Sequence, residues 1–260
     1  MRREILEEAI GIALAAGEEV LEAYAAKCAV KRKQDGSPVT EADRRSQEII
    51  CRGLARVAPE IPIVAEEDYG PNRTEAPADT FWLVDPLDGT KEFVGRNGEF
   101  TVNIALIEFG SPTLGVVFAP ALHRLFAAAP GTAVVEDATG RRELCARCVP
   151  REGATVVSSR SHGDAEALAH FTAGRRIAAS ITAGSSLKLC LVAAGEADLY
   201  PRFGRTMEWD TAAGDAILRA AGGSVTDLDG HPLRYGKPGF ENPPFVASGR
   251  EPTALAGTSR

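Results

Sequence analysis

Two aspartates three positions apart, Asp85 and Asp88, are the side chains of this sequence that most clearly suggest chemistry. They end an apolar run in the segment WLVDPLDGTKEF (82–93). Pro86 ends strand pairing and restrains Asp85 to an extended backbone, and Gly89 permits a sharp turn that can direct both carboxylates to one point. Hard oxygen ligands that converge at a strand end suit Mg²⁺, so the segment predicts a metal site.

Further oxygen donors accompany this pair. The backbone carbonyl of Leu87 is another ligand candidate, and a helix that begins at Thr90 would offer N–H groups to a phosphate. Glu66 ends a second strand-like run, and Asp210 stands at the start of a helical segment. These acids extend the predicted metal site beyond a single segment.

Each acid also has a purely structural explanation when it is considered alone. Asp210 would be a helix N-cap, and Glu66 would be a solvated strand end. Asp43 would be the third helical residue of a capping box that begins at Thr40. Asp85 and Asp88 would belong to a β-turn.

Apolar periodicity predicts the elements that must position these residues. The N-terminal half is expected to hold helices over 3–25 and 40–57, joined by turn chemistry at 35–38, and strands at 61–66, 81–85, 100–109 and 113–120. The Gly110 and Pro112 connection indicates a hairpin.

The stretch 130–153 is poorly patterned, and the pattern resumes after it. Strands are expected at 155–161, 176–182 and 197–203, with a final strand at 224–228, and helices at 163–173, 185–195 and 210–221. Residues 1–150 would form an α+β region with most of the metal ligands. Residues 151–260 would form an α/β region with the substrate-binding residues and the last metal ligand.

Composition restricts the classes of function. Of the 260 residues 44% are apolar, enough for a sizeable core, and the net charge of −7 leaves no broad basic surface for nucleic acid. An anionic ligand must therefore be bound by a few cations, helix N-termini or metal. The charged N-terminus and the absence of about 18 consecutive apolar residues argue against export and membrane spanning. Cys145 and Cys148 form a CxxC without further ligands, so two ordinary thiols in a reduced cytoplasmic protein are favoured over zinc.

The segment 82–93, the upstream AEE, DGSPVTEAD (35–43) and WDTAAGDA (209–216) together resemble the signature set of the lithium-sensitive, Mg²⁺-dependent inositol monophosphatase superfamily. This resemblance implies a layered αβαβα sandwich of the inositol monophosphatase/fructose-1,6-bisphosphatase type. It implies a catalytic pair, Asp43 and Thr90, that orients and activates the attacking water. It also implies two or three Mg²⁺ ions held by Glu66, Asp85, the Leu87 carbonyl, Asp88 and Asp210.

Within the superfamily, KEF after DGT is similar to the bisphosphate nucleotidase (CysQ-type) branch, where inositol monophosphatases usually have TNF. SRSH (159–162), GSSLK (184–188) and YPRFG (200–204) resemble the same branch. The implied substrate contacts are Gly89, Thr90, Ser159, His162, Ser185, Lys188, Arg202 and Asp210. Structural alternatives remain: His162 beside a helix N-cap, Lys188 snorkelling from a helix, and Arg202 as a surface charge.

The reaction that this resemblance implies is hydrolysis of the 3′-phosphate of adenosine 3′,5′-bisphosphate to AMP and phosphate in sulfur metabolism. Phosphoadenylyl sulfate is a second candidate substrate. The alternatives are an inositol monophosphatase with broad sugar-phosphate activity and a non-catalytic binding protein of the same fold. The expected location is the cytoplasm; peripheral association with the inner face of the cell membrane, the number of ions and the oligomeric state are left open.

Overall fold

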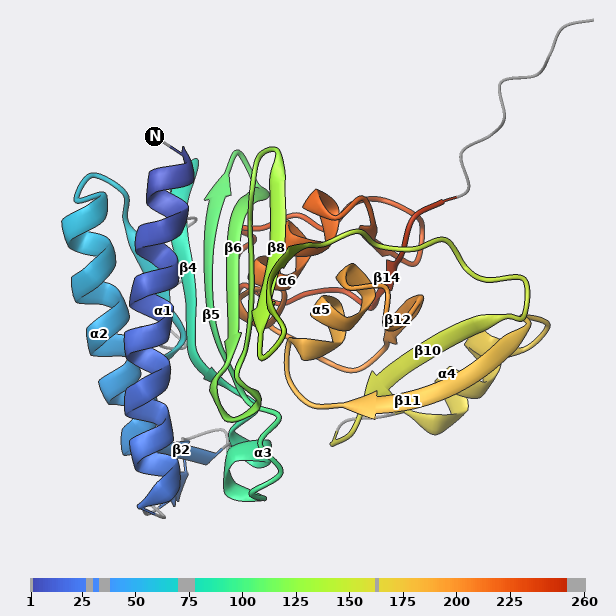
Figure 1. Cartoon of the computed structure of the whole chain (residues 1–260), viewed down its shortest axis with the longest axis horizontal. Helices are drawn as coiled ribbons and strands as arrows, with labels where there is room; N and C mark the ends of the chain where they lie inside the picture. Colours follow the sequence, from blue (N-terminus) through green and yellow to red (C-terminus); the bar gives the residue numbers. More distant parts are fainter. Residues whose placement is uncertain (1, 27–29, 33–37, 70–77, 162–163, 252–260) are drawn as a thin grey trace, which may run out of the picture.

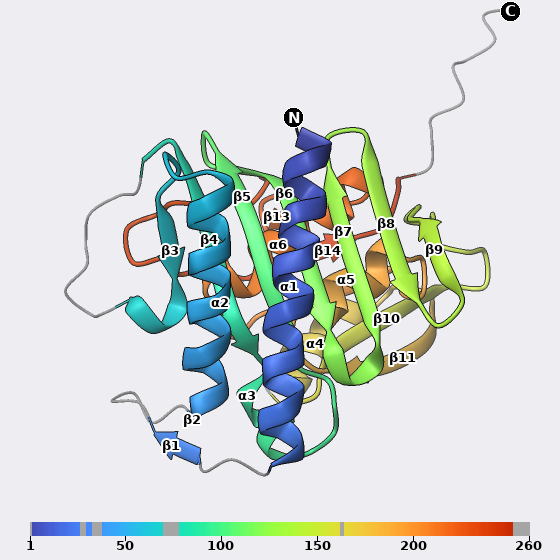
Figure 2. The same cartoon turned by 60° about the vertical axis from the view of Figure 1, so that its left-hand side comes forward.

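The computed structural model describes residues 2–26, 30–32, 38–69, 78–161 and 164–251. Two long helices, α1 (Arg2–Ala25) and α2 (Glu41–Val57), pack against each other and confirm the two helices expected in the N-terminal half. Between them in sequence, β1 (Val30–Arg32) and β2 (Pro38–Thr40) pair antiparallel. Both helices cover one face of a large sheet (Figures 1 and 2).

The large sheet has seven strands in the order of the chain. They are β3 (Ile63–Ala65), β4 (Thr80–Asp88), β5 (Thr101–Glu108), β6 (Ser111–Ala119), β7 (Arg124–Ala129), β8 (Thr132–Asp137) and β9 (Gly140–Glu143). All neighbours are antiparallel except the pair of β3 and β4. The central strands are buried along almost their whole length, which explains why their sequences are continuous apolar runs instead of alternating ones.

A second sheet has five strands in the order β11, β10, β12, β14, β13. Its strands are β10 (Ala154–Ser159), β11 (Ile177–Ala183), β12 (Leu199–Arg202), β13 (Ser224–Asp227) and β14 (Phe245–Ser248). The helices α5 (Leu187–Ala193) and α6 (Glu208–Ala220) lie between the two sheets, and α4 (Ala165–Thr172) covers the outer face of the second sheet (Figure 1). The five layers confirm the expected αβαβα sandwich.

Several expectations about strands were wrong. The stretch 130–153 contains β8 and β9; every residue of β9 is exposed, so this strand depends on backbone pairing and leaves no apolar pattern. β7 was not expected, and β14 follows the strand that the sequence predicted to be the last. Pro86 does not end β4: the strand continues to Asp88 through a register irregularity, where a missing N–H is tolerated.

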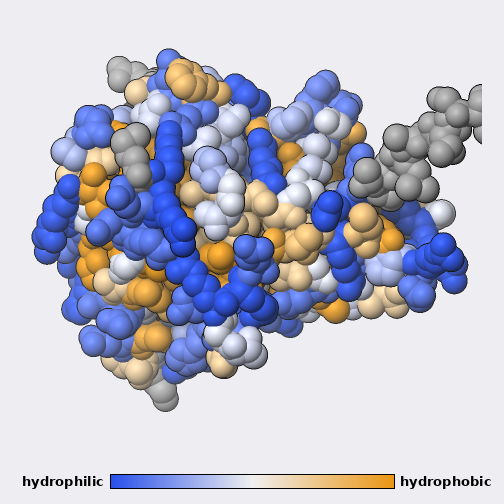
Figure 3. Space-filling view, turned by 45° about the horizontal axis from the view of Figure 1, so that its top comes forward, coloured by the Kyte–Doolittle hydropathy of each residue, from blue (hydrophilic) through white to orange (hydrophobic). Residues whose placement is uncertain are grey.

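The surface is mixed on the face that Figure 3 shows, where hydrophilic side chains surround scattered apolar ones. Among the described residues, no helix is both long and apolar enough to cross a membrane. Cys145 and Cys148 lie exposed, as free thiols, between β9 and β10.

Candidate active site

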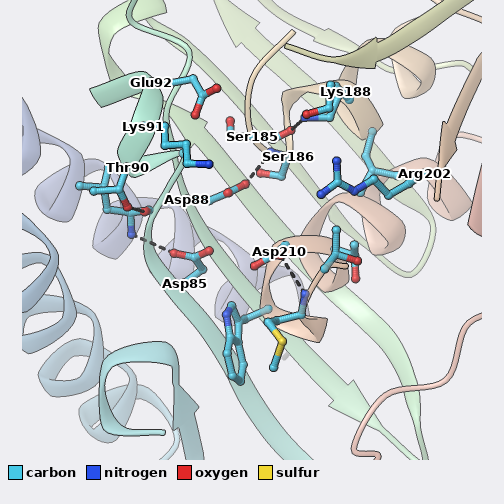
Figure 4. Close-up of a pocket in the computed structure, with 18 of the residues that line it drawn as sticks. Asp85, Asp88, Thr90, Lys91, Glu92, Ser185, Ser186, Lys188, Arg202 and Asp210 are labelled. Atoms are coloured by element: carbon cyan, nitrogen blue, oxygen red, sulfur yellow. Dashed lines mark hydrogen bonds between the residues drawn. The ribbon is translucent and has the colours of Figure 1, made fainter. Parts of the chain in front are cut away.

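A cavity of about 410 Å³ lies where the two sheets approach each other. Its lining comes from the end of β4, the short helix α3 (Thr90–Val94), the end of β10, the start of α5, β12 and the first turn of α6. The cavity therefore collects segments that are more than a hundred residues apart in the chain. Carboxylates gather on one side of it, and two cations, Lys188 and Arg202, lie across from them (Figure 4).

Three predicted ligands form a compact acidic cluster. Carboxylate oxygens of Asp85, Asp88 and Asp210 all lie within 4.8 Å of one another. Asp85 is only 1% exposed, and Glu66 is close enough to bond its carboxyl group. The structure thus brings together the predicted acidic ligands from β4, α6 and the turn after β3.

Backbone donors fix these carboxylates in place. Leu87 N donates to Asp85 Oδ1 at 3.0 Å, Ser186 N donates to Asp88 Oδ2 at 2.6 Å, and Met207 N donates to Asp210 Oδ2 at 2.8 Å. The structural explanation of Asp210 as an N-cap was wrong, because the cap of α6 is Met207 and Asp210 is the third helical residue. Its carboxylate is thereby held at the helix start, facing the cavity.

Mutual repulsion makes this cluster costly without a cation. Burial, then Glu66, Asp88 and Asp210, raise the pKa of Asp85 well above its usual range. Burial also raises the pKa of Asp88 to about 6, although Lys188 and the Ser186 N–H oppose the rise. Burial, with Asp88 and Glu66, raises the pKa of Asp210 as well. Clustered, buried oxygen donors of this kind fit a hard divalent cation such as Mg²⁺.

The turn at Gly89 joins the end of β4, which carries Asp85 and Asp88, to α3. Gly89 has φ +84° and caps α3, a left-handed conformation that glycine adopts without strain. Thr90 Oγ1 lies 3.4 Å from the Leu87 carbonyl oxygen, and both residues line the cavity. Ser46 Oγ donates to the Pro86 carbonyl at 2.7 Å and anchors the same turn to α2.

The two residues of the predicted catalytic pair lie on different elements, Asp43 on α2 and Thr90 on α3. Asp43 is buried in the first turn of α2 and does not line the cavity, whereas Thr90 does. The pairing of Asp43 with Thr90 therefore stays a prediction.

The predicted substrate contacts gather around the same cavity. Gly89, Ser159, Ser185, Lys188 and Arg202 all line it, and His162 lies outside the described residues.

Neither cation has the position that its structural alternative required. Lys188 is 4% exposed and does not snorkel, and Arg202 is 8% exposed and is not a surface charge. Lys188 Nζ donates to the Ser185 carbonyl at 2.5 Å. Burial, partly opposed by Asp88, lowers the pKa of Lys188 to about 8, so the amine is still mostly charged at neutral pH.

Other lining residues were not identified from the sequence. Lys91 and Glu92 lie inside the same motif as the aspartates, and Arg205 follows Arg202 by three positions, so proximity to a motif was the available signal. Ser186 had the same signal, because it lies inside the GSSLK segment (184–188). Its hydroxyl is buried between Thr101 and Asn103, at 2.8 and 2.7 Å.

Comparison with known proteins identifies the class to which this fold and site belong. The family model described as the inositol monophosphatase family matches residues 1–257, and the chain belongs to that family. Proteins described as 3′(2′),5′-bisphosphate nucleotidase CysQ from Escherichia coli O157:H7 and Salmonella typhimurium are 46% and 47% identical to it. These alignments cover 94% and 93% of this chain and 99% and 98% of the relatives.

Solved structures of the same family have the same fold as this chain. The crystal structure of CysQ from Bacteroides thetaiotaomicron has a TM-score of 0.82 and 37% identity, over 96% of this chain and 98% of that one. An inositol monophosphatase of Thermotoga maritima has a TM-score of 0.78 at 26% identity, over 94% and 92%. Enzymes of this family use divalent metal ions, generally Mg²⁺, and the acidic cluster has the oxygen donors that could hold such an ion.

Stabilisation by Mg²⁺ is expected to grow as the pH rises from about 5 to about 7.5. Because the carboxyl pKa of Asp88 is raised to about 6, the folded, metal-free protein binds protons more tightly than the unfolded chain. That contribution to stability is complete below the ordinary pKa near 4 and is lost as the pH rises through about 6. Bound Mg²⁺ offsets the repulsion that deprotonation creates.

The measurement is the difference in Tm between protein in excess Mg²⁺ and protein in chelator across this pH range. Asp215 also has a pKa raised to about 6 by burial, but it pairs with Arg219 and Tyr235 and so contributes equally to both samples. A difference that is constant or shrinks with rising pH would contradict the assignment of the cluster as a metal site.

Proposed function

We propose that this protein hydrolyses the 3′-phosphate of adenosine 3′,5′-bisphosphate, in a Mg²⁺-dependent reaction that gives AMP and phosphate. The observation that carries the proposal is the opposition of charge in one cavity: an acidic cluster on one side and the buried Lys188 and Arg202 on the other. A substrate with two phosphates can place the reacting one at the metal side and the other against the cations. The names of the two bacterial relatives described above, 3′(2′),5′-bisphosphate nucleotidase, support a bisphosphate nucleotide as the class of substrate.

Mg²⁺ held by this set would supply a water of lowered pKa and stabilise charge on the leaving oxygen. We propose Glu66, Asp85, the Leu87 carbonyl, Asp88 and Asp210 as the ligands of two or three ions. The protein fixes the positions of these carboxylates before substrate binds, because the backbone N–H groups of Leu87, Ser186 and Met207 donate to Asp85, Asp88 and Asp210, respectively.

On the substrate side, the first turn of α3 lines the cavity beside Gly89, and the first N–H groups of a helix have no partner within the helix. We infer that these groups bind the reacting phosphate and that Thr90, with Asp43, orients the attacking water. The water oxygen bonds to phosphorus, the bond to the 3′ oxygen breaks, and that oxygen leaves with a proton. Ser159, Ser185, Lys188, Arg202 and His162 are the proposed contacts to the remainder of the nucleotide.

The direct test is phosphate release in Mg²⁺ from adenosine 3′,5′-bisphosphate, phosphoadenylyl sulfate, AMP, inositol 1-phosphate and fructose 1,6-bisphosphate. The proposal requires the highest kcat/KM for one of the two 3′-phosphorylated nucleotides. A preference for inositol 1-phosphate would replace it with the broad sugar-phosphate activity. No turnover of any of them would favour a binding protein.

Thr90→Ala is expected to lower kcat on the order of 10²-fold and to change KM by less than about threefold. The reason is that a hydroxyl that orients water acts in the transition state more than in substrate binding. Steady-state kinetics on adenosine 3′,5′-bisphosphate measures this split, and Thr90→Ser, which keeps the hydroxyl, is the matched control. A rise in KM alone in the alanine variant would assign Thr90 to binding.

We place the protein in the cytoplasm, with residues 1–150 as the region of most metal ligands and 151–260 as the substrate-binding region. The bacterial relatives support this location.

A further inference from the structure

The loop before α5 has an unusual backbone at the centre of the site. Ser185 has φ +43°, in the left-handed region that is unfavourable for a residue with a side chain. On either side of the strained residue, the backbone serves the site directly. Ser186 N donates to Asp88 Oδ2 at 2.6 Å, and the Ser185 carbonyl accepts from Lys188 Nζ at 2.5 Å. The strained turn thus aims one donor at the acidic cluster and one acceptor at the buried cation.

Strain of this kind persists only where neighbouring contacts hold it. Two of those contacts come from Glu99, which precedes β5 of the large sheet and does not itself line the cavity. Glu99 Oε2 accepts from Gly184 N at 2.8 Å, and the Glu99 carbonyl accepts from Ser185 Oγ at 2.9 Å. One residue therefore bonds two consecutive positions of the turn.

Glu99 is itself fixed in place. Arg160, which follows β10, donates to both oxygens of its carboxylate at 2.8 Å. The Glu99 side chain is 20% exposed and that of Arg160 is 43% exposed, so within this ion pair the carboxylate is better shielded from solvent than the guanidinium group. Arg160 also donates to the Thr182 carbonyl at 3.1 Å, which joins the ends of β10 and β11 to the same carboxylate.

Close packing shows that the turn and Glu99 are fitted to each other. A Cβ at Gly184 would lie 2.6 Å from Glu92 Cγ, 2.8 Å from the Glu99 carbonyl oxygen and 2.9 Å from Glu99 Cβ. Only glycine allows this approach, which brings the Gly184 N–H within bonding distance of the carboxylate.

We propose that Glu99 is a positioning residue for the proposed phosphatase reaction: its carboxylate holds the strained 184–186 turn that orients Asp88 and Lys188. It acts through the Gly184 N–H and contacts neither metal nor substrate. The inference rests on the proposed function for its catalytic meaning, but the positioning itself can be measured without any substrate.

The first test is amide hydrogen exchange in the metal-free protein. Glu99→Ala is expected to increase exchange at the Ser186 amide at least tenfold, because the turn loses the acceptor that restrains Gly184. Glu99→Gln keeps an oxygen that can accept from Gly184 N and is expected to stay within about threefold of wild type. Glu196→Ala is the matched control, because it removes another bidentate arginine pair, with Arg124, outside the cavity.

The second test is calorimetric titration with Mg²⁺ alone, where Glu99→Ala is expected to raise the Kd at least threefold and Glu196→Ala to leave it unchanged. In a Ser185→Gly background the effect of Glu99→Ala on exchange at the Ser186 amide is expected to shrink. Glycine adopts the left-handed backbone without strain, so the turn then depends less on the contacts of Glu99. Exchange at Ser186 within twofold of wild type in Glu99→Ala would overturn the proposal, as would equal effects in Glu99→Ala and Glu196→Ala. If wild type fails to hydrolyse adenosine 3′,5′-bisphosphate, the proposed function fails, yet these measurements still decide the role of Glu99.

Discussion

Asp85→Asn is expected to lower the rate of Mg²⁺-dependent phosphate release about 10³-fold or more. The same change is expected to make the metal-free protein more stable. Burial is the largest cause of the raised pKa of Asp85, and the neighbouring carboxylates of Glu66, Asp88 and Asp210 raise it further. A neutral amide removes part of this repulsion and can still accept from Leu87 N, which lies 3.0 Å from Asp85 Oδ1. The same amide is a poor ligand for Mg²⁺.

The stability effect is measured as Tm in chelator and in excess Mg²⁺. In chelator we expect a rise of several degrees, since about 1 kcal/mol corresponds to roughly 2–4 °C for a protein near this size. In excess Mg²⁺ the wild type should gain stability by ligand binding and the variant should gain much less.

Asp198→Asn is the matched control. Asp198 is also fully buried, but it bonds Arg147 and Thr155 away from the cavity, so its replacement should destabilise the protein with and without Mg²⁺. Retention of more than a tenth of wild-type activity in Asp85→Asn would remove Asp85 from the ligand set. A lower Tm in chelator would show that repulsion within the cluster costs less stability than the contacts of the Asp85 carboxylate provide.

Lys188→Met is expected to reduce the preference for a nucleotide with a second phosphate by about tenfold or more. A charge-assisted hydrogen bond to phosphate contributes roughly 1.5–3 kcal/mol. Methionine keeps most of the apolar stem of lysine and removes the ammonium group, whose nitrogen lies 5.3 Å from the centroid of the Tyr200 ring. The relevant quantity is the ratio of kcat/KM for adenosine 3′,5′-bisphosphate to kcat/KM for adenosine 3′-monophosphate. The two substrates share the reacting phosphate and differ only in the 5′-phosphate.

Lys188→Met is also expected to cause a smaller decrease in kcat/KM that is the same for both substrates. Lys188 lowers the pKa of Asp88, so removal of the ammonium group makes Asp88 harder to deprotonate and shifts the acid limb of kcat/KM to higher pH. Lys188→Arg keeps the charge and should retain more of the ratio than methionine does. If the ratio in Lys188→Met stays within twofold of wild type, Lys188 does not contact the second phosphate.

Local chemistry made much of the site predictable. Asp85, Asp88 and Gly89 lie within five consecutive residues, and the left-handed turn that Gly89 allows is a property of the backbone itself. The continuous apolar runs of β4 and β5 likewise predicted buried strands. The overall αβαβα architecture, in contrast, came from resemblance and not from periodicity alone.

Other elements leave little trace in sequence because their stability comes from partners. β9 is exposed at every residue and exists through its backbone bonds with β8. β4 passes through Pro86 because β5 pairs with it on both sides of the irregularity, from Asp85 opposite Asn103 to Asp88 opposite Thr101. In both cases the neighbouring strand decides the outcome, and a local rule about exposed residues or proline misses it.

The sequence by itself determined which groups can do chemistry here: carboxylates at strand ends, a glycine turn and an α3 that begins at Thr90. Only the tertiary structure decided which of them meet. It placed Asp210 against β4, buried Lys188 across the cavity, and made Glu99 the support of a turn 85 residues away in the chain. Ligand type follows from covalent chemistry and short-range backbone limits, whereas proximity, burial and the resulting pKa shifts depend on packing between distant segments, which no local pattern records.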